Sequence, residues 1–142
     1  MISGLKPELS VWVIDDSRDF SVAFSRYIEF IAGFQCTKCF DSAERALAAL
    51  DNKTSSPDVI LMDFEMPGMK GLEAIVPLKQ AAPKSRIYIV TLKDTTWHKR
   101  TALKKGADGY IVKPDITKEE LMEILALPAP ELRPKQQDRG SQ

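Results

Sequence analysis

Short apolar runs alternate with longer amphipathic segments along most of this chain. Five short runs have the apolar, β-branched or aromatic content typical of strands: residues 11–14, 34–40, 58–63, 86–91 and 109–113. Between and after these runs, apolar positions recur every three or four residues, which is the spacing of one helical face. This spacing predicts helices at residues 17–33, 41–50, 95–107 and 117–127, and one that begins near residue 72.

Strands and helices that take turns predict a doubly wound α/β fold, with one five-stranded parallel sheet and helices on both faces. The run at residues 58–63 is almost continuously apolar, as expected of a strand buried on both sides. At the helix starts we expect Ser17 as an N-cap, and Asp41 with Glu44 as a capping box. Pro77 lies inside the third helix, which it should kink or shorten.

Length and composition indicate a single globular domain. The chain has 142 residues, which suffice for one ordinary core and are too few for two. We place the domain at residues 10–127, after an N-terminal tail at residues 1–9. Residues 128–142 are rich in proline and polar side chains and have no periodicity, so we expect a disordered tail or the stump of a linker.

The charge balance argues against two classes of partner. The 20 Lys and Arg residues match the 20 Asp and Glu residues, so the formal net charge is zero. This balance does not favour nucleic acid or an anionic membrane as the main partner. No stretch has the apolar length of a signal peptide core or a membrane span, so we expect no membrane insertion and a cytoplasmic location.

Cys36 and Cys39 form a Cys-x-x-Cys sequence within the second predicted strand. A redox pair usually opens a helix, and a zinc site needs two further ligands. Strand residues three apart should also point to opposite faces of the sheet. We therefore interpret both cysteines as ordinary strand residues in a reducing compartment.

The strand ends carry the candidate chemistry, because an open parallel sheet binds ligands beyond the carboxyl ends of its strands. The residues at these ends are Asp15, Asp16, Asp63, Thr91 and Lys113. Two carboxylates about 4 Å apart repel by about 4 kcal/mol at an effective dielectric near 20, so such a cluster needs a cation. Oxygen ligands with open positions suit Mg²⁺.

A Mg²⁺ ion at these carboxylates would also support phosphoryl transfer. The ion neutralises oxygens of an incoming phosphoryl group, so the Asp63 carboxylate can attack phosphorus and become an aspartyl phosphate. Lys113 can then pair with one phosphoryl oxygen, and the Thr91 hydroxyl can donate to another.

Four motifs in this order resemble the receiver domains of two-component response regulators, including the single-domain chemotaxis regulators. They lie at residues 13–17, 58–75, 89–91 and 106–114. The resemblance extends from about residue 10 to residue 127, nearly the whole chain. It implies a flavodoxin-like fold with strand order 2-1-3-4-5.

The resemblance also implies roles for the acidic residues. Asp63 corresponds to the phosphoacceptor, and Asp15 and Asp16 correspond to metal ligands. The backbone carbonyl of Glu65 corresponds to a further metal ligand, and the Glu65 side chain adds a negative charge at the rim of the site.

Five further positions match or depart from the family pattern. Lys113 before Pro114 matches the lysine that precedes a cis peptide bond in the family. Thr91 and Tyr110 match the switch pair, in which the hydroxyl moves toward the phosphoryl group and the aromatic ring fills the space behind it. Leu92 replaces the usual small residue, so we expect Leu92→Ala to change phosphorylation or dephosphorylation rates.

These implications lead to a phosphorylation-activated signalling switch. The phosphoryl group would come from a sensor histidine kinase or a phosphotransfer protein. We expect no enzyme activity beyond Mg²⁺-assisted self-phosphorylation and autodephosphorylation. The output would be a protein contact through the fourth helix, fifth strand and last helix, where basic residues and Trp97 lie.

Three alternatives remain open at this point. The chain could be a receiver-like interaction module that works without phosphorylation, or the receiver fragment of a larger regulator. It could also be a Mg²⁺-dependent phosphohydrolase with Glu65 as acid/base, although no cap insertion or substrate pocket is visible in the sequence.

Overall fold

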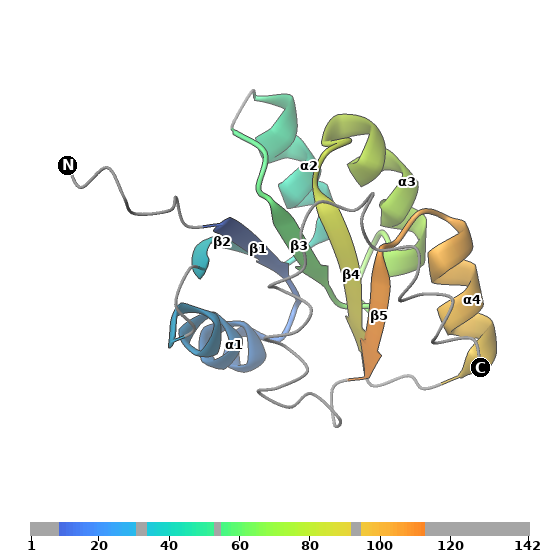
Figure 1. The fold of residues 1–142 in the computed structure, drawn as a ribbon, viewed down its shortest axis with the longest axis horizontal. Helices are drawn as coiled ribbons and strands as arrows, with labels where there is room; N and C mark the ends of the chain where they lie inside the picture. The colour runs from blue at the N-terminus through green and yellow to red at the C-terminus, as the bar shows by residue number, and fades with distance from the viewer. Residues whose placement is uncertain (1–8, 31–33, 53–54, 92–94, 113–142) are drawn as a thin grey trace.

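The computed structural model describes residues 9–30, 34–52, 55–91 and 95–112, which form one twisted parallel sheet with helices packed on it (Figure 1). Within these residues the elements are β1 (Leu9–Ile14), α1 (Arg18–Phe30), β2 (Phe34–Phe40), α2 (Ala43–Asp51), β3 (Val59–Met62), α3 (Gly71–Ala81), β4 (Arg86–Thr91), α4 (Thr96–Lys104) and β5 (Gly109–Val112). The strand order is β2-β1-β3-β4-β5, and all four pairings are parallel. The predicted fold class and strand order are therefore confirmed.

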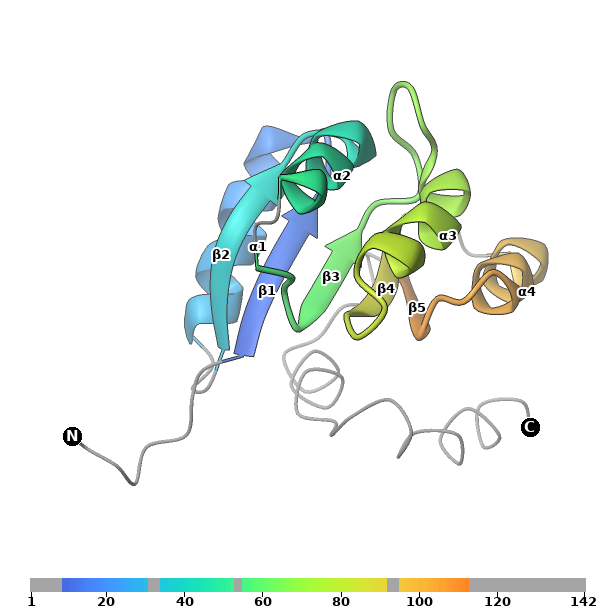
Figure 2. The same cartoon turned by 90° about the horizontal axis from the view of Figure 1, so that it is seen from above.

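The helices cover the sheet on both faces, as Figure 2 shows from above. Alternate side chains of β1 pack on the two faces of the sheet, because successive strand residues point to opposite sides. Trp12 and Ile14 belong to the core cluster that α2, α3 and α4 cover, whereas Val11 and Val13 belong to the cluster that α1 covers. All four side chains are at most 1% exposed. Burial of a large apolar side chain stabilises a fold by about 1.5 to 3 kcal/mol relative to leaving it in water.

The helix starts follow the expected chemistry with one exception. The Ser17 hydroxyl accepts a hydrogen bond from the Phe20 amide at 3.2 Å, as predicted for an N-cap. In α2, however, the N-cap is Ser42, whose hydroxyl accepts from the Arg45 amide, so the predicted Asp41 capping box is wrong. Asp41 pairs instead with the Arg45 side chain at 3.2 Å, one helical turn away.

The remaining boundaries stay close to their predicted positions. Helix α3 begins at Gly71 and continues past Pro77 to Ala81. The predicted helix at residues 117–127 and the two predicted tails lie wholly or largely outside the described residues. In the described part of the chain, no helix is both long and apolar enough to cross a bilayer.

Strand β2 lies at an edge of the sheet and contains a bulge. Val11 of β1 pairs with Cys36, but the next residue, Trp12, pairs with Lys38. Thr37 is therefore an extra residue with no partner on β1, which is the definition of a β-bulge.

The bulge changes the direction of the two cysteines. Cys36 lies opposite Val11 and Cys39 lies opposite Val13, and these two β1 residues share one face of the sheet. Cys36 and Cys39 consequently share that face as well. The expectation that they point to opposite faces is wrong. In a regular strand, residues three apart point to opposite faces, but the extra residue Thr37 makes Cys36 and Cys39 equivalent to residues two apart.

Candidate functional site

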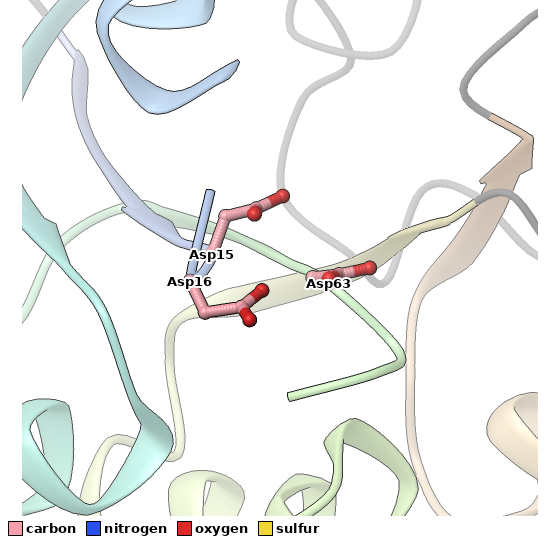
Figure 3. Close-up of side chains that lie close together, drawn as sticks. All are labelled: Asp15, Asp16 and Asp63. Atoms are coloured by element: carbon pink, nitrogen blue, oxygen red, sulfur yellow. The ribbon is translucent and has the colours of Figure 1, made fainter. Parts of the chain in front are cut away.

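Three carboxylates meet at the carboxyl edge of the sheet. Asp15 and Asp16 directly follow β1, and Asp63 directly follows β3. Because β1 and β3 are neighbouring parallel strands, their carboxyl ends lie side by side. One carboxylate oxygen from each residue lies within 4.8 Å of those of the other two, and Figure 3 shows the three side chains gathered at one place.

Backbone hydrogen bonds fix the positions from which these side chains project. The Asp15 amide donates to the Phe40 carbonyl of β2 at 2.9 Å, and the Asp63 amide donates to the Ile14 carbonyl of β1 at 2.8 Å. Both bonds extend the sheet ladder by one residue past the strand ends. The carboxylates are therefore attached to the rigid part of the fold rather than to a free loop.

The three carboxylates differ in their exposure to water. Asp15 is 3% exposed and Asp63 is 8% exposed, whereas Asp16 lies on the surface. Oδ1 of Asp15 accepts a hydrogen bond from the Ser17 amide at 2.7 Å. Two buried carboxylates beside a third are costly without compensating positive charge, because burial removes their hydration and like charges repel.

The donor set indicates which ions the cluster fits. All three groups are carboxylates, which suit hard cations such as Mg²⁺ or Ca²⁺, and no histidine or cysteine belongs to this cluster. The exposed Asp16 leaves one side accessible, so water can complete the coordination of a bound ion, as Mg²⁺ prefers. The residues present therefore fit a hard divalent cation.

Two hydrogen bonds hold the loop between β3 and α3, one to α2 and one within the loop. Oε2 of Glu44 in α2 accepts a hydrogen bond from the Met69 amide at 2.9 Å. The Gly71 amide donates to the Phe64 carbonyl at 2.9 Å. A Cβ atom at Gly71 would lie 2.4 Å from the Asp63 carbonyl oxygen, so only glycine allows this close approach. Glu65, in the same loop, has an exposed side chain.

The predicted switch residues lie on the two strands beyond β3. Thr91 ends β4 and is 1% exposed, and Tyr110 on β5 is half-buried against the core cluster beneath α2, α3 and α4. Lys113, Pro114 and Leu92 lie outside the described residues. The structure thus brings together Asp15, Asp16 and Asp63, and it places Thr91 at the end of the strand beside Asp63.

A cleft of about 650 Å³ borders the acidic pair on the side of α1. Its walls include Asp15 and Asp16, the basic side chains of Arg18 and Arg45, and Cys39. Sequence reasoning missed the two arginines, although each stands within the first turn of a predicted helix that starts at a strand end. Cations at this position attract anionic ligands toward the carboxylate cluster.

A chain of aromatic rings starts next to Asp63. Phe64 and His98 meet edge to face, with ring centroids 4.5 Å apart, and His98 meets Trp97 with centroids 5.1 Å apart. Phe64 is 9% exposed, whereas Trp97 at the start of α4 is 65% exposed. The rings thus connect the loop after Asp63 with the surface of α4, a contact that the sequence did not predict.

The sequence comparison identifies the class to which this fold and site belong. The family description "Response regulator receiver domain" matches residues 11–126. The chain therefore belongs to the receiver domain family of two-component response regulators.

Two curated relatives that the chain matches are longer proteins. The chain is 38% identical over 104 residues to the DNA-binding transcriptional regulator NtrC of Salmonella typhimurium, covering 73% of this chain and 21% of NtrC. It is 42% identical over 69 residues to the nitrate/nitrite response regulator protein NarL of Escherichia coli, covering 49% of this chain and 32% of NarL. The chain thus spans about a fifth to a third of the length of these curated relatives.

Solved receiver domains have the same architecture. The signal receiver domain of the putative response regulator NarL from Mycobacterium tuberculosis superposes with a TM-score of 0.75 at 25% identity, covering 84% of this chain and 94% of that one. The response regulator domain of Thermotoga maritima CheB superposes with a TM-score of 0.73 at 28% identity, covering 83% and 93% of the two chains.

Proposed function

We propose that this receiver domain is a phosphorylation switch that accepts a phosphoryl group on Asp63 in a Mg²⁺-dependent reaction. The observation that carries the proposal is the cluster of three carboxylates within 4.8 Å at the ends of two adjacent strands, in a chain of the receiver family. The donor would be a sensor histidine kinase or a phosphotransfer protein, the partner class of the family.

The carboxylates of Asp15, Asp16 and Asp63 would hold the Mg²⁺ ion, together with the backbone carbonyl of Glu65. When bound, the ion supplies positive charge that offsets the repulsion between the carboxylates and the incoming phosphoryl oxygens. The hydrogen bond from the Ser17 amide fixes Oδ1 of Asp15, so this carboxylate needs little reorganisation to serve as a ligand.

In the proposed reaction an oxygen of the Asp63 carboxylate attacks phosphorus. A new O–P bond forms as the bond from phosphorus to the donor breaks, and the donor leaves with the bonding electron pair. The strand end and the Gly71 contact hold Asp63 in place, which favours in-line attack through positioning. Thr91 would donate its hydroxyl to a phosphoryl oxygen, and Lys113 would pair with another.

The switch would then act through the surface of α4 and β5. A phosphoryl group favours the conformer that places Thr91 against it, and Tyr110 would follow by filling the space behind Thr91. We infer that partners read this change on the surface formed by α4, β5 and the predicted last helix. Exposed basic side chains and the exposed Trp97 on α4 are typical of a protein-binding surface.

Intact mass spectrometry after incubation with acetyl phosphate tests the proposal. We expect one phosphoryl adduct on the wild type with Mg²⁺, and none with EDTA or on Asp63→Asn. The control variant is Asp51→Asn, because Asp51 is an exposed carboxylate that lies at the end of α2, outside the cluster.

Two outcomes would contradict the proposal. An adduct that persists on Asp63→Asn would place the phosphoacceptor elsewhere. A wild type that gains no adduct from acetyl phosphate, or from a histidine kinase, would favour an interaction module that works without phosphorylation.

A further inference from the structure

Outside the acidic cluster, two thiols lie close together in the described residues, those of Cys36 and Cys39. Their sulfur atoms lie 3.7 Å apart on the edge strand β2. Both are free thiols, Cys36 half-buried and Cys39 exposed. This distance is van der Waals contact between two sulfurs, and a modest rotation of the side chains would bring them within bonding distance.

The β-bulge at Thr37 creates this contact. Cys36 and Cys39 lie opposite Val11 and Val13, which are two residues apart on β1. Two residues of a regular strand span about 6.6 Å, so the Cα atoms of the cysteines are separated by about this distance along the strand. Disulfides span Cα separations of about 4.4 to 6.8 Å, and the pair falls at the upper end of this range. Without the bulge the separation would be about 10 Å and no bond could form.

The two sulfurs have different surroundings. Burial and, second, the nearby Cys39 raise the pKa of the Cys36 thiol to about 12. Cys36 also packs against the core cluster beneath α1. Cys39 is exposed and lines the cleft beside Asp15 and Asp16. A dissolved reagent therefore reaches the sulfur of Cys39 first.

We propose that Cys36 and Cys39 form a reversible disulfide by exchange with a small-molecule disulfide such as glutathione disulfide. The Cys39 thiolate attacks one sulfur of glutathione disulfide, forms a mixed disulfide and releases one glutathione thiolate. Cys36 loses its proton to water or buffer and attacks the Cys39 sulfur, which releases the second glutathione. The protein loses two electrons and two protons, and the glutathione disulfide is reduced to two glutathione molecules.

Geometry and charge make the second step possible but slow. Formation of the mixed disulfide removes the free Cys39 thiol, whose proximity is one of the causes that raise the pKa of Cys36. Burial remains, so Cys36 stays mostly protonated and the mixed disulfide on Cys39 should accumulate transiently. Cys39 is exposed, and an exposed disulfide is easily reduced.

A glutathione redox titration of the full chain, read by intact mass and peptide mapping, tests the proposal. We expect the native wild type to lose two hydrogen atoms and to retain no glutathione at equilibrium, with full reversal by dithiothreitol. Cys36→Ser should instead retain one glutathione on Cys39, because it has no second thiol. Cys39→Ser should react much more slowly, because only the half-buried Cys36 remains.

Three results would overturn the proposal. One is a wild type that keeps glutathione on Cys39 at equilibrium, as Cys36→Ser does. Another is oxidation that produces only linked dimers, with a yield that rises with protein concentration. The third is loss of the two hydrogens only in urea, since the native bulge would then not support the bond.

Discussion

Replacement of Asp16 by asparagine should have opposite effects on stability in the absence and in the presence of Mg²⁺. The substitution keeps the shape of the side chain and removes one of three negative charges that lie within 4.8 Å of one another. Without a metal ion, this relieves repulsion in the folded state. With the ion, it removes a proposed ligand.

The geometry sets the size of the first effect. Two unit charges 4.8 Å apart repel by about 3.5 kcal/mol at an effective dielectric of 20, and by about 0.9 kcal/mol in water. Asp16 is exposed, so the lower figure is the better guide. The repulsion from its neighbour Asp15 partly persists in the unfolded chain, which leaves the encounter with Asp63 as the main difference. We expect Asp16→Asn to be more stable by up to about 1 kcal/mol in EDTA.

Urea unfolding followed by circular dichroism measures both effects. At a Mg²⁺ concentration 100 times the dissociation constant, binding stabilises the wild type by about 2.7 kcal/mol, whereas the variant gains much less. The order of stability should therefore reverse on addition of Mg²⁺. Higher ionic strength should shrink the difference in EDTA, because salt screens exposed charges.

The control variant Asp51→Asn should change stability by less than about 0.5 kcal/mol with or without Mg²⁺, since Asp51 lies outside the cluster. If Asp16→Asn were no more stable than the wild type in EDTA, the carboxylates would not repel as their distances require. If it were more stable but the order did not reverse with Mg²⁺, the cluster would carry repulsion without being a metal site.

Other substitutions test the packing around the site. Gly71→Ala should cost at least about 2 kcal/mol in urea unfolding, because its Cβ would lie 2.4 Å from a backbone oxygen; an unchanged midpoint would show that the loop can shift freely. Ile75→Ala should cost about 2 to 5 kcal/mol, because this side chain is fully buried in the core; a loss below 1 kcal/mol would contradict its burial. Trp97→Phe should change stability by less than about 0.5 kcal/mol and remove most of the acrylamide-quenchable fluorescence, since the remaining Trp12 is 1% exposed.

The fold follows from the sequence because its signals are local and repeated. The apolar runs of β1 and β3 are short and dense, and an acidic residue directly follows each, so the end of each strand is visible in the sequence. The convergence of Asp15, Asp16 and Asp63 followed from one topological rule about the carboxyl ends of parallel strands. That rule needs only the strand ends and their order.

Features that depend on contacts between distant segments could not be read from the sequence. The bulge at Thr37 arises from how β2 aligns with β1, and the residues of β2 alone gave the opposite orientation for Cys39. Glu44 was expected to close a capping box, but its carboxylate binds the Met69 amide, 25 residues away. No pattern of neighbouring residues predicts a hydrogen bond over this distance in the sequence.

The contact between His98 and Phe64 was missed for a similar reason. His98 stood in a run of basic residues, which is typical of a solvated helix face. Its ring meets Phe64 only because α4 packs beside the end of β3 in the folded chain.

The pairing of β1 with β3 also has a consequence for the order of folding events. These neighbours in the sheet are separated in the chain by α1, β2 and α2, so a long loop must close before Asp15 and Asp63 can meet. Contacts between residues close in the sequence cannot bring Asp15 and Asp63 together. The repulsion between them develops only when β1 pairs with β3. We therefore expect the repulsion among these carboxylates to grow as the central ladder forms, and a divalent ion bound to them would reduce it during refolding.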